Sequence, residues 1–276
     1  MKKLLILATL GLSFQSFAQS YLILNNGVTL TTDKDSYVYD FGHFIAPYQV
    51  NLNGGQFLVQ DEKLITIDEK GFLYRKDEKV KKVKGKGTNY FITDNNNLYT
   101  IDAAGFFYKF DKEAAVKKAA NFGGNFFTVN ADEKKKIVDL YTLNTKGNYF
   151  KTNVAGLNPA DIATFGGSFF VTNKNVVYTV SKDGFVFSKA EVKVGAIKKA
   201  GGNYFVDAAG VIFTVTNEGF LMVPTLPASL KIASIAKLGL NYFIDTDGKL
   251  FVVDGAGAII ERTIDHDLRN TKVLSL

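Results

Sequence analysis

A short pattern recurs seven times along the chain, at intervals of roughly 35 residues. In its clearest copy, Tyr-Phe-Ile at 90–92 is followed by Leu-Tyr-Thr-Ile at 98–101 and Phe-Phe-Tyr at 106–108. Related copies begin near Tyr21, Phe57, Phe126, Phe169, Tyr204 and Tyr242. Aromatic and β-branched residues in short runs favour β-strands. A fixed period of such runs indicates a circular or stacked β architecture.

The spacing within one repeat predicts its strand number. Each copy carries three clear β-patterned runs, and a weaker run, as at 80–83, 116–120, 194–199 and 230–235, lies before the next copy. Four strands in each of seven units predict an all-β fold, a seven-bladed β-propeller of four-stranded blades. The expected repeats span about 20–53, 54–86, 87–122, 123–165, 166–200, 201–238 and 239–276 of a single domain, 19–276. Solenoids have fewer strands per repeat and a shorter period, so they fit less well.

The apolar residues indicate how the blades would pack. Runs such as Tyr90-Phe91-Ile92 are continuous instead of alternating, as in strands that are buried on both faces. We therefore expect most of the 24 phenylalanines and 13 tyrosines to lie between blades. The last residues, 272–276, resemble the weak first run. We expect them to complete one blade with residues 21–41, so that N- and C-terminal strands close the ring without an open edge.

A polar residue follows the third strand of every repeat, and three residues later comes a glycine or serine. The polar residues are Asp33, Asp68, Asp102, Asn144, Ser181, Thr216 and Asp254. The later residues are Ser36, Gly71, Gly105, Gly147, Gly184, Gly219 and Gly257. A side chain that binds its own backbone, followed by a residue free to adopt positive φ, is hairpin-turn chemistry. Because Asn, Ser and Thr replace Asp, we interpret this set as turn residues, not as a metal or catalytic ring.

The N-terminus predicts export. Lys2 and Lys3 precede an apolar run at 4–12, and the small residues Ser16 and Ala18 follow it. This is the pattern of a cleaved secretory signal peptide, 1–18, with Gln19 as the first mature residue. No cysteine follows the apolar run, so we expect no lipid anchor, and no later segment is long enough to cross a membrane. The predicted location is periplasmic or secreted.

Composition narrows the chemistry. The absence of cysteine excludes disulfides, thiolate nucleophiles and thiolate metal ligands. Loss of the signal peptide would lower the formal net charge from +6 to +4, because it removes two lysines and no acid. That mild excess suits anionic neighbours such as an envelope polymer. The basic residues are nearly all lysine and form no arginine-rich stripe, so we expect no nucleic-acid partner.

The segment from Tyr90 to Lys109 resembles a known repeat. Its Leu98-Tyr99-Thr100-Ile101-Asp102, followed by Gly105 and a fourth strand, is similar to the repeat of pyrroloquinoline-quinone-type β-propellers. That family closes the fourth strand with tryptophan, where this chain has Tyr74 and Tyr108. The chain also lacks the cysteine pair and the length of the quinone-dependent dehydrogenases. The resemblance therefore implies the non-catalytic branch, which includes an envelope lipoprotein used in outer-membrane assembly, and it implies no cofactor.

Two groups of residues are candidates for a site. Lys82, Lys118, Lys199 and Lys237 lie just before unit boundaries. If their strand is innermost, they would line the channel mouth and attract an anionic ligand; if it is outermost, they would block edge-to-edge pairing. His43 and His266, with Asp265 and Asp267, would form a metal site if ring closure brought their loops together.

These observations favour an exported, non-catalytic binding or assembly module for an envelope protein or polysaccharide, including an anionic one. We expect a monomer. The irregular segments 130–138, 152–163 and 223–229 are the expected binding loops, since loops carry function on rigid scaffolds. The alternative is a carbohydrate- or phosphoester-active hydrolase or lyase. It would require carboxylates with strongly perturbed pKa values at the channel mouth.

Overall fold

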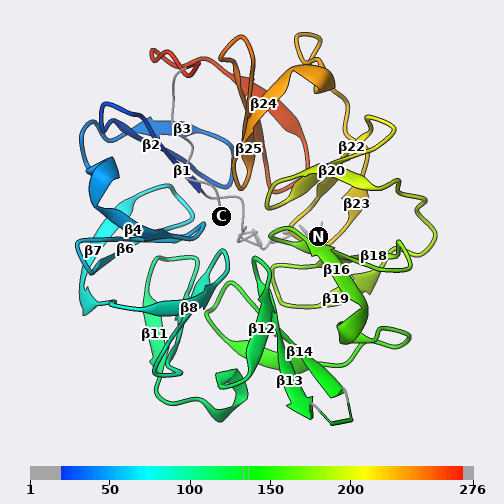
Figure 1. The fold of residues 1–276 in the computed structure, drawn as a ribbon. Coiled ribbons are helices and arrows are strands. Elements are labelled where there is room, and N and C mark those ends of the chain that lie inside the picture. The colour runs from blue at the N-terminus through cyan, green and yellow to red at the C-terminus, as the bar shows by residue number, and fades with distance from the viewer. Residues whose placement is uncertain (1–19, 133, 136, 270–276) are drawn as a thin grey trace, which may run out of the picture.

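The computed structural model describes residues 20–132, 134–135 and 137–269, and the predicted signal peptide and the predicted closing strand at 272–276 lie outside this part. Seven antiparallel sheets stand around a common centre (Figure 1). In chain order the sheets are β1–β3, β4–β7, β8–β11, β12–β15, β16–β19, β20–β23 and β24–β27. We call them blades 1 to 7. The predicted seven-bladed β-propeller is confirmed.

The strands are short, and their bounds repeat from blade to blade. Blades 1 to 3 contain β1 (Ser20–Ile23), β2 (Thr29–Thr32), β3 (Val38–Asp40), β4 (Val50–Asn53), β5 (Phe57–Gln60), β6 (Lys63–Ile67), β7 (Leu73–Lys79), β8 (Val83–Lys86), β9 (Tyr90–Thr93), β10 (Leu98–Ile101) and β11 (Phe107–Phe110). Blades 4 and 5 contain β12 (Ala119–Phe122), β13 (Phe126–Asp132), β14 (Ile137–Leu143), β15 (Tyr149–Thr152), β16 (Ile162–Phe165), β17 (Phe169–Thr172), β18 (Val177–Val180) and β19 (Val186–Ser188). Blades 6 and 7 contain β20 (Ile197–Ala200), β21 (Tyr204–Asp207), β22 (Ile212–Val215), β23 (Leu221–Met222), β24 (Ile235–Leu238), β25 (Tyr242–Asp245), β26 (Leu250–Val253) and β27 (Ile259–Arg262). Single 3₁₀ turns lie at η1 (Pro47–Gln49), η2 (Ala114–Val116), η3 (Pro159–Asp161) and η4 (Ile232–Ser234).

The first strand of a complete blade lies nearest the centre. First strands of neighbouring blades touch: the Lys86 ammonium of β8 donates to the Asn53 carbonyl of β4, and Gly85 of β8 lies against the Phe122 ring of β12. First strands of neighbouring blades can touch only where the blades converge, near the centre of the ring. The fourth strands, such as β7 and β11, lie at the outer edge (Figure 1).

The prediction of the first strands was wrong in position. They begin three to five residues later than the weak runs, at Val83, Ala119, Ile197 and Ile235. The apolar residues that open three of these runs, Val80, Val116 and Leu230, are buried in the loops that precede the strands. The strands themselves lie near the axis, where space is short. A Cβ atom on Gly85 would lie 2.2 Å from the ring of Phe122, so the innermost strand there needs a residue without a side chain.

The loops divide the molecule into two unlike faces. Because successive strands are antiparallel, the loops between first and second strands emerge on the same face as those between third and fourth strands. On this uniform face each first loop of blades 2 to 7 has three residues, as at 54–56, and every second loop has five, as at 33–37. The opposite, variable face carries the remaining loops, whose lengths differ.

An outer ring of hydrogen bonds joins all seven blades on the uniform face. In each five-residue loop the second residue donates its backbone N–H to the carbonyl of its counterpart in the next blade, over 2.7 to 3.4 Å. The donors in order are Lys34, Glu69, Ala103, Thr145, Lys182, Asn217 and Gly255, and Gly255 donates back to Lys34. The ring therefore closes within the described residues.

A second, inner set of bonds joins the three-residue loops. In each bond a backbone N–H donates to a backbone carbonyl of the following blade, over 2.6 to 3.1 Å. The donor and acceptor pairs are Gly55 and Thr88, Thr88 and Gly124, Gly124 and Gly166, Ser168 and Gly202, and Gly202 and Leu240. The backbones approach so closely that a Cβ on Gly124 would lie 2.1 Å from the Gly167 Cα. The Gly-Gly pairs at 54–55, 123–124, 166–167 and 201–202 all lie in these three-residue loops.

Aromatic rings fill much of the space between blades, although eleven phenylalanine and tyrosine side chains are exposed. The first aromatic residue of a second strand packs on the second residue of the equivalent strand in the next blade. The pairs, with ring centroids 4.7 to 5.4 Å apart, are Phe57–Phe91, Tyr90–Phe127, Phe126–Phe170, Phe169–Phe205 and Tyr204–Phe243. These residues are fully buried. Such contacts stabilise the ring through burial and ring geometry together.

Candidate functional site

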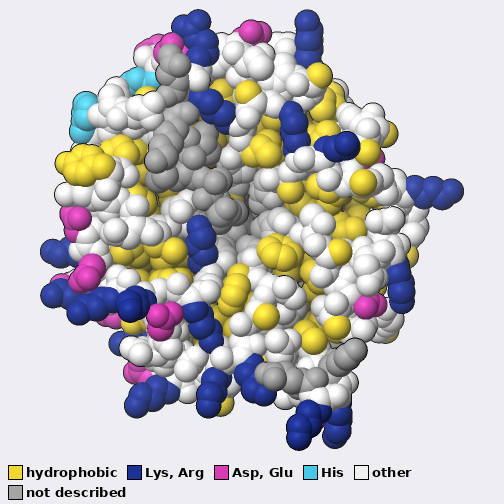
Figure 2. Space-filling model, in the orientation of Figure 1, with side chains coloured by type: hydrophobic (Ala, Val, Ile, Leu, Met, Phe, Trp, Pro, Cys, Tyr) yellow, Lys and Arg dark blue, Asp and Glu magenta, His cyan; other side chains and the backbone are white. Residues whose placement is uncertain are grey.

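The variable face carries the loops that differ between blades. The loops from a fourth strand to the next first strand range from three residues, at 80–82, to twelve, at 223–234. Figure 2 shows Lys and Arg side chains spread around the visible face, with Asp and Glu among them. Six of the predicted site residues lie in variable-face loops: Lys82, Lys118, His43, Asp265, His266 and Asp267.

Lys82 borders a basic hollow. The hollow measures about 380 Å³. Its charged lining comprises Lys79, Lys81, Lys82 and Lys109 with Glu78 and Asp94. Glu78 is already engaged, because it accepts the Tyr99 hydroxyl at 2.7 Å and lies 3.7 Å from the Lys109 ammonium. The exposed Lys81 and Lys82 form no ion pair within the described part of the chain, so the hollow carries an excess of positive charge.

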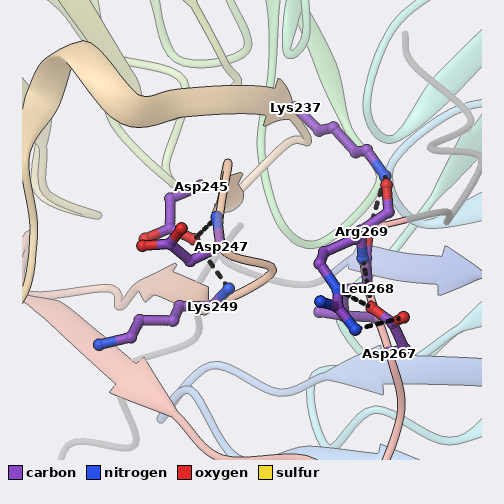
Figure 3. Close-up of polar contacts among 7 residues, drawn as sticks. All are labelled: Lys237, Asp245, Asp247, Lys249, Asp267, Leu268 and Arg269. Atoms are coloured by element: carbon purple, nitrogen blue, oxygen red, sulfur yellow. Dashed lines mark hydrogen bonds and ion pairs between the residues drawn. The ribbon is translucent and has the colours of Figure 1, made fainter.

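Lys199 and Lys237 do a different job from Lys82. They occupy the same position in the inner strands β20 and β24. The Lys199 ammonium donates to the Ile235 carbonyl of the next blade. The Lys237 ammonium donates to the carbonyls of Leu268 and Arg269, at 2.8 and 2.6 Å (Figure 3). Burial lowers the pKa of Lys237. Both lysines thus join successive segments around the axis.

Lys118 is exposed directly before β12. It does not occupy the strand position of Lys199 and Lys237. The structure therefore does not bring the four predicted lysines into one cluster. Whether any of them binds an anionic ligand stays a prediction.

The predicted histidine and aspartate site is divided between other partners. The His266 Nε2 atom lies 2.8 Å from an Asp40 carboxylate oxygen, across the junction of blades 7 and 1. The Arg269 guanidinium binds Asp267 through two bonds of 2.8 and 2.9 Å and lowers the Asp267 pKa to about 2 (Figure 3). Among residues 20–132, 134–135 and 137–269, no group of three or more His, Cys, Asp or Glu side chains could hold a metal ion. His43 and Asp265 join no such group.

The recurring turn carboxylates have a structural role in the turn, as predicted. The Asp102 Oδ1 atom accepts the N–H groups of Ala104 and Phe106, and Oδ2 accepts the Tyr108 hydroxyl. Asp33 and Asp68 make the same three contacts, and Asn144, Ser181, Thr216 and Asp254 accept the N–H four residues on. The Asp245-Thr246-Asp247-Gly248 segment is likewise a turn, in which Asp245 accepts the N–H groups of Asp247 and Lys249 (Figure 3).

A seam groove lies on the outer edge between blades 4 and 5, beside the predicted binding loop at 152–163, although no single site residue was predicted there. It measures about 750 Å³, and its lining includes Phe150, Lys151, Asn153, Asp183, Phe185 and Phe187. The groove adjoins the irregular segment at 152–163 and the five-residue loop at 181–185.

The seam groove coincides with a break in the repeat. In five blades a third-strand threonine donates to the carbonyl of the turn glycine in the next blade, over 2.6 to 2.8 Å: Thr31, Thr66, Thr100, Thr179 and Thr214. The equivalent Thr142 instead pairs with the Thr152 hydroxyl at 2.8 Å. Thr152 is the cause, because no other blade has a hydroxyl at that register position. An alignment of the seven repeats would have shown this difference.

The fourth strand also departs from the pattern at this seam. Elsewhere a fourth-strand side chain covers the turn glycine of the next blade: Tyr39, Tyr74, Tyr108, Phe187 and Met222 cover Gly71, Gly105, Gly147, Gly219 and Gly257. Phe150 occupies this position in blade 4, but the nearest neighbours of Gly184 are Thr142 and Leu143. Phe150 is 46% exposed and borders the groove.

Comparisons with known proteins identify no family. No family model matches the chain, and no curated protein matches it. Solved structures of similar fold include a catalytically inactive virginiamycin B lyase from Staphylococcus aureus with quinupristin, 12% identical over 92% of this chain and 97% of that one, TM-score 0.37. They also include an AofleA mutant from Arthrobotrys oligospora, 11% identical over 95% and 88%, TM-score 0.30.

Because these identities and TM-scores are low, the fold assignment rests on the sheet order and the outer ring of hydrogen bonds in this chain. The resemblance to pyrroloquinoline-quinone-type repeats stays a prediction, while the propeller fold that it implies is the observed one. No helix within the described residues has the length and apolar character needed to cross a bilayer.

Proposed function

We propose that the protein is an exported, non-catalytic binding module that recruits an envelope protein or polysaccharide. One observation carries this proposal: loops of fixed length and two sets of inter-blade hydrogen bonds occupy one face, while loops of two to twelve residues occupy the other. A rigid scaffold that presents variable loops on one side is suited to recognition.

The charge of the variable face supports an anionic partner. Lys79, Lys81 and Lys82 border the same hollow, and Glu78, one of its two acidic residues, is held by Tyr99 and Lys109. Several lysines near one hollow attract anions, and the attraction falls with salt. Lys118 would add to this contact from the neighbouring blade, whereas Lys199 and Lys237 would act mainly on the ring itself.

The proposal is tested by affinity capture from a cell-envelope extract, with mass spectrometry and sugar analysis of the retained material. The K81E/K82E double variant should lose most of an anionic partner at low salt. The matched control is K70E/K146E, since Lys70 and Lys146 are exposed in five-residue loops of the uniform face. Equal loss with both variants, or no material retained by the unaltered protein, would contradict the proposal.

A further inference from the structure

The seam groove contains two aromatic rings that lack the partners of their counterparts. Aromatic side chains occupy the last position of the five-residue loop in five blades, and all are exposed: Tyr37, Phe72, Phe106, Phe185 and Phe220. Four of these rings contact a cation or a second ring. Arg262 lies over Tyr37, Lys76 over Phe106 and Lys189 over Phe220, and Phe72 packs against the Tyr39 ring. Phe185 has no such contact within the described part of the chain.

Phe150 is the second bare ring. It contacts no other aromatic ring or cation among the described residues, and it covers no turn glycine. Phe187 completes the aromatic lining, although Lys189 lies over its ring at 5.4 Å. Two unpartnered rings therefore border one groove. They lie at the seam where Thr142 bonds Thr152 of its own blade, whereas the equivalent threonines of five other described blades bond the turn glycine of the next blade.

The polar groups at the groove offer both donors and acceptors, and the one unmatched charge among them is that of a carboxylate. The exposed Asn153 side chain supplies an amide, and the exposed Asp183 supplies a carboxylate that forms no ion pair with a described residue. The nearby Lys151 ammonium is 2.8 Å from Asp139, so its charge is already matched. An anionic ligand would therefore gain little here.

We propose that the seam groove binds a neutral saccharide chain, which would name one ligand class for the binding function proposed above and rests on it. A pyranose ring has weakly positive C–H groups that can lie on the negative face of an aromatic ring. Its adjacent hydroxyls both donate and accept, so an amide and a carboxylate can bind them together. The groove volume of about 750 Å³ falls in the range of ligand sites.

An extended peptide is the main competing occupant. Peptide anchors that contribute most to affinity sit in enclosed, desolvated pockets. Here Phe150, Phe185 and Phe187 remain 46%, 65% and 40% exposed, which suits stacking in an open groove better than enclosure of an apolar side chain.

The test is binding to a panel of immobilised neutral glycans, followed by titration of chitotetraose, cellotetraose and maltotetraose into the isotopically labelled protein. At least one tetrasaccharide should shift the amide signals of residues 150–155 and 183–187 saturably. F185A should weaken this binding by about tenfold or more, because an aromatic ring that a bound ligand covers contributes a factor of about ten or more to the affinity. F106A is the matched control: Phe106 is 62% exposed at the equivalent position and lies outside the groove, so its loss should leave affinity unchanged.

Each other outcome rejects the groove site or its ligand class. No saccharide binding at up to about 10 mM, or equal effects of F185A and F106A, would overturn the proposal. A captured protein that F185A releases while no saccharide binds would show a peptide site. Retention of the same envelope partner by the unaltered protein and by F185A would leave the binding function intact and remove the groove from it. Both variants should melt like the unaltered protein, because the two rings are exposed.

Discussion

At the scale of single residues, the recurring polar side chains after the third strands complete backbone hydrogen bonds of their own loops, as predicted. Asp102 accepts two N–H groups of its own loop and the Tyr108 hydroxyl, and Asn144 performs the backbone part of this role in the next blade. The hydrogen bond from Tyr108 to Asp102 also raises the Tyr108 pKa. The turn therefore requires an acceptor oxygen at this position, and a negative charge is not essential.

Replacement of Asp102 tests this interpretation. D102A leaves two loop N–H groups and the Tyr108 hydroxyl without an acceptor, and it should lower the free energy of unfolding by about 1–3 kcal/mol. D102N keeps an acceptor oxygen and should cost clearly less. Urea denaturation of both variants gives the comparison. Equal losses would show that the charge, not the acceptor, stabilises the loop.

The Asp40–His266 contact predicts a pH dependence at the junction of blades 7 and 1. The bond from His266, with a second from the Gly42 N–H, lowers the Asp40 pKa. A lowered pKa means that the carboxylate stabilises the fold above the ordinary aspartate value, and that this contribution is lost as the pH falls through the lowered value. Because both side chains are partly exposed, solvent screening keeps the effect within about 1 kcal/mol.

D40N should therefore lower the melting temperature slightly at pH 7, and by less as the pH falls below the ordinary aspartate pKa. Thermal melts of the variant and the unaltered protein across this range measure the difference. A gap that stays constant with pH would show that Asp40 acts through its shape alone.

At the scale of elements, the uniform face depends on the close approach of its three-residue loops. G124A would place a Cβ 2.1 Å from the Gly167 Cα, where backbone must move. We expect a loss of about 1–3 kcal/mol or more, together with weaker protection of the inner hydrogen bonds. G195A is the control, because Gly195 lies in a variable-face loop with its nearest contact at 3.3 Å, and its cost should stay near 0.5 kcal/mol. Similar melting of the two variants would contradict the close-packed ring.

The sequence predicted outer elements better than inner ones for a physical reason. Second strands begin where aromatic runs begin, as at Tyr90 and Tyr204, because those rings fill the inter-blade core. First strands were misplaced because the apolar residues before them, such as Val80 and Val116, are buried in the preceding loops, while the strands themselves mix polar and apolar residues. The seam groove could not be read from one repeat, since it depends on Thr142, Thr152 and Gly184, which come from different elements and two blades.

At the scale of the whole molecule, hydrogen bonds and apolar packing join blade 7 to blade 1. Arg262 of blade 7 donates to the Ser36 carbonyl of blade 1 at 2.8 Å, and the Tyr242 hydroxyl lies 3.4 Å from the Tyr21 carbonyl. A cluster that includes Leu22, Leu30 and Val252 is buried between the two blades. These contacts hold the three described strands of blade 1, β1 to β3, against blade 7.

Deletion of residues 272–276 tests the predicted closing strand. Its removal would leave the inner edge of β1 unpaired, and we expect the melting temperature to fall by about 5–10 °C, equivalent to a few kcal/mol for a chain of this size. Unchanged melting would show that the junction contacts alone close the ring.

The central claim, a closed circle of seven blades, is tested most directly by hydrogen exchange of the seven outer-ring amides. The account predicts slow exchange of Lys34, Glu69, Ala103, Thr145, Lys182, Asn217 and Gly255, at rates that lie close together, because each amide donates to the next blade. Exchange of Gly255 at the rate of the variable loops, with the other six protected, would show an open ring and contradict the account.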